Sequence, residues 1–185
     1  MTQFFWILLG LVVLVIVYFW SLYNSLVSLK NQIEESVSQI DVQLKRRADL
    51  IPNLIETVKG YVKHEKTVFT EVTKARSALM NAGSLAKKAE ASNMVTEALG
   101  KLFAIAEAYP NLKANENFVQ LQKELADTED KVAFARQYYN NIVQEFNTKI
   151  QTFPNTLVNE KLGFTEKEFF QASDEERKTV KVTFS

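Results

Sequence analysis

The chain has 185 residues, and its 22 Lys and Arg residues balance its 22 Asp and Glu residues, so that its formal net charge is zero. This balance argues against a protein that binds duplex nucleic acid, because neutralising phosphates requires a basic excess. The absence of cysteine excludes disulfides, thiolate metal sites and thiol nucleophiles. Five glycines and three prolines, set among long periodic runs, predict an all-α protein.

The N-terminal residues predict a transmembrane helix. No charged side chain occurs before Lys30, and the seventeen residues from Phe4 to Trp20 are apolar apart from Tyr18. As a helix this run is ~25 Å long, and an extension to Leu22 approaches the ~30 Å hydrocarbon thickness of a bilayer. Aromatic residues at both ends are typical of rings in the headgroup layers. The anchor residues that we single out are Phe4, Trp6, Leu11, Tyr18 and Trp20.

A cleaved signal peptide is the alternative interpretation of this segment. It is disfavoured because the basic n-region and a small-residue cleavage site are both missing and the apolar run is long. Cations follow the anchor, at Lys30 and then at Lys45 to Arg47, and none precedes it. By the positive-inside rule the N-terminus faces outward and the body of the protein faces the cytoplasm. We therefore expect an anchor and juxtamembrane segment over residues 1–29 and a helical-bundle domain over residues 30–185.

A seven-residue apolar repeat follows the anchor and predicts one long helix to about residue 80. The absence of proline and glycine between Leu11 and Ile51 allows the anchor to continue into this helix, and Asn81 to Gly83 predict a glycine C-cap. The first register comprises Val37, Leu44, Ile51, Val58, Glu65, Val72 and Leu79; the second comprises Ile33, Ile40, Arg47, Leu54, Tyr61, Val68 and Ala75.

Two further helices are expected in the bundle. A short helix places Val95 and Tyr109 on one face, is capped by Ser92 or Asn93, and ends before Pro110. The segment from Ser84 to Ala91 is either a loop or a further helical turn. A long helix begins after Asn115, spans ~36 residues and stops at Pro154. Its two apolar registers comprise Phe118, Leu125, Val132, Tyr139, Phe146 and Phe153, and Leu121, Thr128, Ala135 and Ile142.

The C-terminal residues carry two weaker signals. Thr165, with Glu168 three residues later, predicts a capping box that opens a short helix containing Phe169 and Phe170. The alternating tail from Thr179 to Ser185 is typical of a strand or an extended arm. The expected architecture is an elongated bundle of three to four helices.

The motifs of common catalytic and cofactor sites are missing from the sequence. The single histidine, His64, lies among charged residues without a Gly-x-Ser-x-Gly elbow or a Glu-x-x-His pair. The five glycines are isolated from one another, so no phosphate-binding loop is visible. Carboxylate pairs such as Glu34 with Glu35 are adjacent on a helix and point apart. We therefore expect no enzyme, no cofactor and no metal site.

The stretch KRRADLIPNLIE, Lys45 to Glu56, places three cations before a proline in a helical pattern. The unbroken register favours a single kinked helix through Pro52 that leaves the Ala48 carbonyl free for water or a partner donor, and the alternative is a break with Asp49 as the new cap. The cations are either a solvated face or a contact for a partner. The candidate partner or oligomer contacts are Lys45, Arg46, Arg47, Asp49, Pro52, Asn53, Glu56 and Glu65.

Two charged residues, Arg47 and Glu65, interrupt the apolar registers. Either charge would be costly if it were buried alone. The interpretation that we favour is that both side chains extend to water from a partly exposed seam. The alternative is a polar contact that fixes helix register or oligomeric state.

Three long motifs in this chain resemble the bacterial LemA family: IDVQLKRRADLIPNLIETVKGYVKHE from Ile40, EAYPNLKANENFVQLQKEL from Glu107, and ARQYYNNIVQEFN from Ala135 with FP after it. The resemblance implies a single-pass protein of the bacterial inner membrane with a small external N-terminus and a cytoplasmic antiparallel helical bundle. It brings with it no catalytic residues and no established activity.

Several functions are compatible with these features. The first is a non-enzymatic, membrane-anchored scaffold that self-associates as a homo-oligomer or docks an unidentified protein partner. The second is an oligomer that organises or shapes the lipid bilayer. A third is a membrane-tethered enzyme that uses Glu56, His64 or Tyr109, and a fourth is a nucleic-acid-binding protein that uses Lys45 to Arg47; both are disfavoured.

Overall fold

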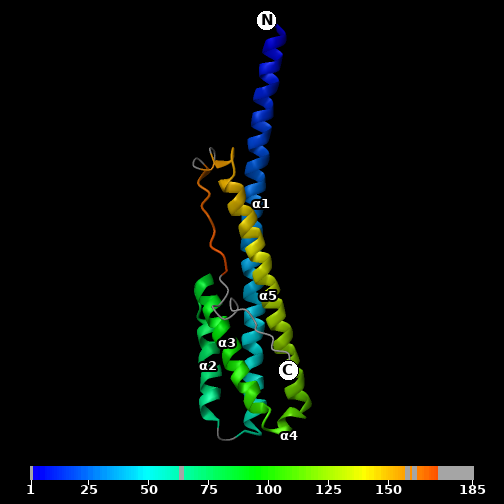
Figure 1. Ribbon diagram of the computed structural model, residues 1–185, viewed down its shortest axis with the longest axis vertical. Helices are drawn as coiled ribbons and strands as arrows, with labels where there is room; N and C mark the ends of the chain where they lie inside the picture. Colours follow the sequence, from blue (N-terminus) through cyan, green and yellow to red (C-terminus); the bar gives the residue numbers. More distant parts are fainter. Residues whose placement is uncertain (1, 63–64, 157–158, 160–161, 171–185) are drawn as a thin grey trace, which may run out of the picture. The chain divides into compact units, whose positions relative to one another are not determined.

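A computed structural model describes residues 2–62, 65–156, 159 and 162–170 of the chain, and all the long regular elements among them are helices (Figure 1). These are α1 (Thr2–Lys59), α2 (Lys66–Met80), α3 (Leu85–Ala106), α4 (Pro110–Lys113) and α5 (Glu116–Gln151). The prediction of an all-α bundle with a long apolar N-terminal helix is confirmed. The chain divides into two units, the first made of Met1–Ser38 and Tyr138–Phe169, the second of Gln39–Gln137 and Phe170–Ser185.

Helix α1 is continuous for 58 residues and includes both the apolar run and Pro52. The expectation that the anchor continues into the first bundle helix is thus confirmed, as is continuity through the proline. Every side chain from Phe4 to Tyr18 is exposed, and this part of α1 is apolar and long enough to cross a membrane. Helix α1 therefore contains a candidate membrane span.

The first unit packs the next part of α1 against the C-terminal part of α5. Four buried residues of α1 follow a helical spacing, and burying each apolar side chain contributes about 1.5–3 kcal/mol. The buried apolar residues of this unit are Leu22, Leu26, Leu29 and Ile33 on α1 and Tyr139, Ile142, Val143, Phe146 and Ile150 on α5.

An extended segment over residues 164–170 follows α5 in the chain, where we predicted a short helix. That prediction is wrong, and the contacts of the segment explain why. Asn147 on α5 donates to the carbonyl of Lys167 and accepts from its N–H, both at 2.8 Å. The Tyr139 hydroxyl donates to the carbonyl of Glu168, and the Phe164 ring packs against Phe146. These bonds satisfy the N–H and carbonyl of Lys167 and the carbonyl of Glu168 from outside the segment, so these groups do not need helical hydrogen bonds.

The second unit contains the remainder of α1, all of α2, α3 and α4, and the first part of α5. In Figure 1 α2 runs back alongside α1, and α3 reverses again beside α2. The prediction of one helix to residue 80 is wrong, because α1 ends at Lys59 and the chain turns at Gly60. The fully buried side chains of this unit include Ile40, Ile51, Leu54, Val58, Val72, Val95, Leu102, Leu112 and Val132.

Helix ends in the second unit differ in part from those expected. Helix α3 begins at Leu85, with the Ser84 hydroxyl accepting from Lys87 N–H, so the prediction of a cap at Ser92 or Asn93 is wrong. Helix α2 ends with Asn81 as the C-cap at a negative φ, so the predicted glycine cap at Gly83 is also wrong. The start of α5 is confirmed: the Asn115 side chain accepts from the Phe118 N–H at 3.0 Å and caps it.

Candidate functional site

The residues of the predicted cationic contact are separated by the fold. Lys45 and Arg46 are exposed, whereas the Arg47 side chain is 3% exposed. Since successive residues of a helix are about 100° apart, only one of the three cations can face the core. The interpretation of Arg47 as a side chain at a partly exposed seam is therefore wrong, and so is its place in a surface contact.

Arg47 on α1 forms a polar cluster with Thr96 on α3 and Glu129 on α5. Its guanidinium makes an ion pair with Glu129 and donates from Nη1 and Nη2 to the Thr96 hydroxyl at 3.2 Å. Burial lowers the pKa of Arg47 from its usual value, and the nearby Arg136 lowers it further, whereas the contact with Glu129 opposes both effects. A buried cation with these partners fixes how three helices meet, which agrees with the alternative interpretation of a register-setting contact.

The Ala48 carbonyl has a donor within the chain. Pro52 has no N–H to complete the helical bond to Ala48, and Arg76 Nε on α2 donates to the Ala48 oxygen instead, at 2.8 Å. The expectation of water or a partner at this oxygen is wrong. The proline therefore links α1 to α2 within the second unit.

The other predicted contact residues lie on or near the surface. Asp49, Pro52, Asn53 and Glu56 are exposed, and Glu56 pairs with Lys59 at 3.0 Å. Glu65 is half-buried at the N-cap of α2 and makes no capping hydrogen bond. Whether these residues meet a partner stays a prediction. A different set of residues on α1 and α2 lines a groove in this unit.

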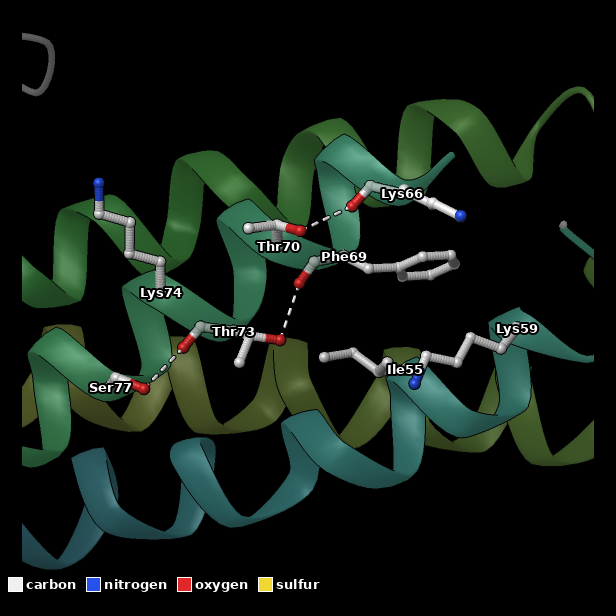
Figure 2. Close-up of a pocket in the computed structure, with 8 residues that line it drawn as sticks. All are labelled: Ile55, Lys59, Lys66, Phe69, Thr70, Thr73, Lys74 and Ser77. Atoms are coloured by element: carbon white, nitrogen blue, oxygen red, sulfur yellow. Dashed lines mark hydrogen bonds between the residues drawn. The ribbon is translucent and has the colours of Figure 1, made fainter. Parts of the chain in front are cut away.

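This feature is an open groove of about 650 Å³ between α1 and α2, which we call the lysine groove. Figure 2 shows Ile55 and Lys59 reaching it from α1, and the Phe69 ring projecting from α2 toward them. Lys74 also lines the groove, and its side chain rises from α2 in the direction away from α1. The lysine groove is lined by Ile55, Lys59, Lys66, Phe69, Thr70, Thr73, Lys74 and Ser77.

The lysine groove is apolar at its floor and cationic at its edges. Among the described residues that line it, three are lysines and none carries a carboxylate. The hydroxyls of Thr70, Thr73 and Ser77 donate to helix carbonyls four residues earlier, as the dashed lines in Figure 2 show. The hydroxyl oxygens are thus held in place along α2. This arrangement suits a ligand that is apolar on one side and anionic on the other.

The sequence could have predicted the side of this groove that α2 forms. Lys66, Thr70, Thr73, Lys74 and Ser77 recur at the spacing of one helix face. The opposite wall, from α1, has no sequence signal of its own, because it depends on the chain reversal at Gly60.

In the part of the chain that the structure describes, no group of three His, Asp or Glu side chains is placed to hold a metal ion. His64 lies outside the described residues. Tyr109 is half-buried at the N-cap of α4, and Glu56 is engaged with Lys59 on the surface.

Comparisons with known proteins identify relatives of this chain. The sequence model of the LemA family matches residues 36–184. The chain is 31% identical over 181 residues to Protein LemA of Metamycoplasma hominis, an alignment that covers 96% of this chain and 83% of the relative. It is 23% identical over 175 residues to the magnetosome proteins MamQ 2 and MamQ 1 of Paramagnetospirillum magneticum, covering 80% of this chain and 64% of each relative.

The chain therefore spans less than two thirds of the length of the MamQ proteins. None of these names indicates an enzymatic activity. The match of the family model over most of the chain, together with a relative at 31% identity, shows that the chain belongs to the LemA family.

Proposed function

We propose that this LemA-family chain is a membrane-anchored, non-enzymatic scaffold that docks an acidic amphipathic helix of a protein partner in the lysine groove. The observation that carries the proposal is the composition of the groove, with Ile55 and Phe69 at its floor and three lysines around them. Amphipathic helices bind grooves of this kind by laying their apolar face on the floor.

The spacing of the cations along α2 fits such a partner. Lys66 and Lys74 are eight residues apart on one helix, or about 12 Å. Carboxylates on successive turns of a partner helix recur every four residues, so two or three of them span the same distance. Lys59 contributes a third cation from α1. Complementary charge of this kind gives specificity and a faster association rate rather than affinity alone.

The proposal also includes the anchoring of the chain in a membrane through α1. The exposed apolar run of α1 supports insertion in a bilayer, and the absence of cations before Lys30 supports an external N-terminus with the bundle in the cytoplasm of a bacterium. Homo-oligomerisation, which the heptad pattern suggests, stays a prediction. So does the alternative of a membrane-organising oligomer, for which a closed assembly with anchors packed side by side would be the diagnostic finding.

The docking proposal is tested with two designed helical peptides that share an apolar face and carry either Glu or Lys on the polar face. Full-length protein in nanodiscs is titrated with each fluorescent peptide, and binding is followed by anisotropy. We expect the acidic peptide to bind at least tenfold more tightly than the basic one. Raising the salt concentration should weaken this binding, because the pairing charges are exposed.

Charge reversal locates the binding site. The double substitution Lys66→Glu and Lys74→Glu should reduce affinity for the acidic peptide at least tenfold. The matched control, Lys87→Glu with Lys123→Glu, makes the same change in net charge at exposed lysines outside the groove and should leave affinity within twofold. Equal effects of the two double substitutions, or equal binding of the two peptides, would overturn the proposal.

A further inference from the structure

Phe153 leaves the apolar core at the end of α5. The heptad pattern places it in the same seam as Phe146, yet its side chain is 75% exposed whereas Phe146 is 0% exposed. Helix α5 ends at Gln151, and a turn over residues 152–155 follows. The prediction of a core position for Phe153 is therefore wrong. A large aromatic side chain projects from this turn.

Two side chains hold the turn against α1 within the first unit. The Tyr18 hydroxyl donates to Asn155 Oδ1 at 2.7 Å, and Asn155 Nδ2 donates to the carbonyl of Lys149 at 2.8 Å. Asn155 is buried, so these bonds are sheltered from water. Lys149 also donates to the Ser25 hydroxyl at 2.6 Å. The end of α5 is thus fixed beside the stretch of α1 from Tyr18 to Ser25.

This stretch of α1 is the end of the candidate membrane span. Tyr18 and Trp20 close the apolar run, and Trp20 and Tyr23 are exposed. Exposed aromatic side chains at the end of a span lie in the headgroup layer, where their rings are partly buried among lipids. Asn155 holds the turn at Tyr18, and Phe153, two residues earlier in the same turn, is exposed close to this end of the span. Lys149 adds a cation there, which suits anionic headgroups.

We propose that the turn at the end of α5 rests in the lipid headgroup layer, with the Phe153 ring inserted among the lipids beside Tyr18 and Trp20. The partner of this surface is the bilayer itself. The inference rests on the membrane anchor of the proposed function and adds a second point of attachment, 135 residues away in the chain from Tyr18. With both points held, the first unit has a fixed tilt at the membrane surface.

The chain has no cysteine, so a single engineered one can report the position of the turn. The exposed Gln151 is changed to cysteine and labelled with an environment-sensitive fluorophore in full-length protein in liposomes. Lipids that carry a nitroxide in the headgroup should quench this label. Phe153→Ser should reduce the quenching at least twofold, and Phe153→Trp should retain it.

Two controls separate the inference from the anchor on which it rests. A label at Val17→Cys, within the apolar run, should be quenched by a nitroxide on the acyl chain if the anchor spans the bilayer. Phe134→Ser in the Gln151-labelled protein changes an equally exposed phenylalanine of α5, at 72%, and should leave the quenching unchanged. Circular dichroism checks that each variant keeps its helix content.

The outcomes are distinct. Quenching at Val17 without quenching at Gln151, or with no effect of Phe153→Ser, overturns the inference and leaves the anchor intact. Absence of quenching at Val17 overturns the anchor and the inference together. If a pyrene label at Gln151 gives excimer emission and lipids do not quench the fluorophore, a second copy covers Phe153 and the inference is wrong.

Discussion

At the scale of single residues, Arg47 shows how the helix period sorts three adjacent cations. Lys45 and Arg46 remain in water, and Arg47 enters the core between α1, α3 and α5. Removing a guanidinium from water carries a desolvation cost that only a well-placed partner offsets. Glu129 and Thr96 are those partners. The cluster therefore contributes more to the choice of helix arrangement than to net stability.

We expect Arg47→Ala to destabilise the protein by about 3 kcal/mol, because it leaves the Glu129 carboxylate in a partly buried site without its cation. Arg46→Ala, the neighbouring and exposed cation, should change stability by no more than about 0.5 kcal/mol. Urea unfolding of the full-length protein in detergent, followed by circular dichroism, measures both. Similar values for the two variants would show that the Arg47 pair is not structural.

At the scale of elements, a hydrogen bond connects α1 and α2 because Pro52 cannot donate one within α1. A buried carbonyl without a donor costs about 1–3 kcal/mol, and Ala48 is fully buried. Arg76 on α2 supplies the donor that residue 52 lacks. Helix α2 is thus held against α1 by a bond that exists because α1 contains Pro52. This bond lies in the same unit as the lysine groove, which α1 and α2 form together.

A double-mutant cycle tests this link. Arg76→Ala should destabilise the protein by about 2 kcal/mol because it leaves the Ala48 carbonyl without a partner. In a Pro52→Ala background, residue 52 regains its N–H, so the cost of Arg76→Ala should fall below about 1 kcal/mol. Urea unfolding of the four proteins gives the coupling energy. An unchanged cost in the two backgrounds would contradict the link.

The sequence predicted the helices better than the connections between them. The period of apolar residues identified the buried faces of α1 and α5 because burial acts on each helix separately. The apolar pattern does not reveal the break between α1 and α2. Val58, before the break, and Val72, after it, are fourteen residues apart, which is two full heptads. The reversal thus leaves the seven-residue pattern in phase. Gly60 was its one local signal.

The site was predictable only in part for a related reason. The need of Arg47 for a partner follows from the sequence, but its partner Glu129 is 82 residues away and is brought to it by the fold. The lysine groove requires Ile55 and Phe69 to face each other from antiparallel helices, which the assumption of one long helix ruled out. The exposure of Phe153 depends on where α5 ends, and helix ends are the least regular part of an apolar pattern.

At the scale of the whole molecule, the distribution of charge sets the orientation that we expect in the membrane. The part of α1 that can span a bilayer has no cation on its N-terminal side, and Lys30, Lys45 and Arg46 follow it. A bacterial membrane retains such cations on the cytoplasmic side.

Labelling of single cysteines tests this orientation. In intact bacterial spheroplasts, Thr2→Cys should react with a membrane-impermeant maleimide. Ala86→Cys, at an exposed position of α3, should react only after the membrane is permeabilised. The opposite pattern would place the helical bundle outside the cell, and recovery of the protein in the soluble fraction would contradict the anchor.

The residue ranges that make up the two units determine the order in which the units can fold during synthesis. The second unit draws its helices from the contiguous residues 39–137, whereas the first unit needs residues 138–169 to cover the stretch of α1 from Leu22 to Ile33. Tyr18 leaves the ribosome 137 residues before Asn155, its hydrogen-bond partner. Since domains fold as their residues emerge, the second unit can assemble while the first still waits for half of its core. The stretch of α1 beside the anchor is thus made well before the part of α5 that packs against it.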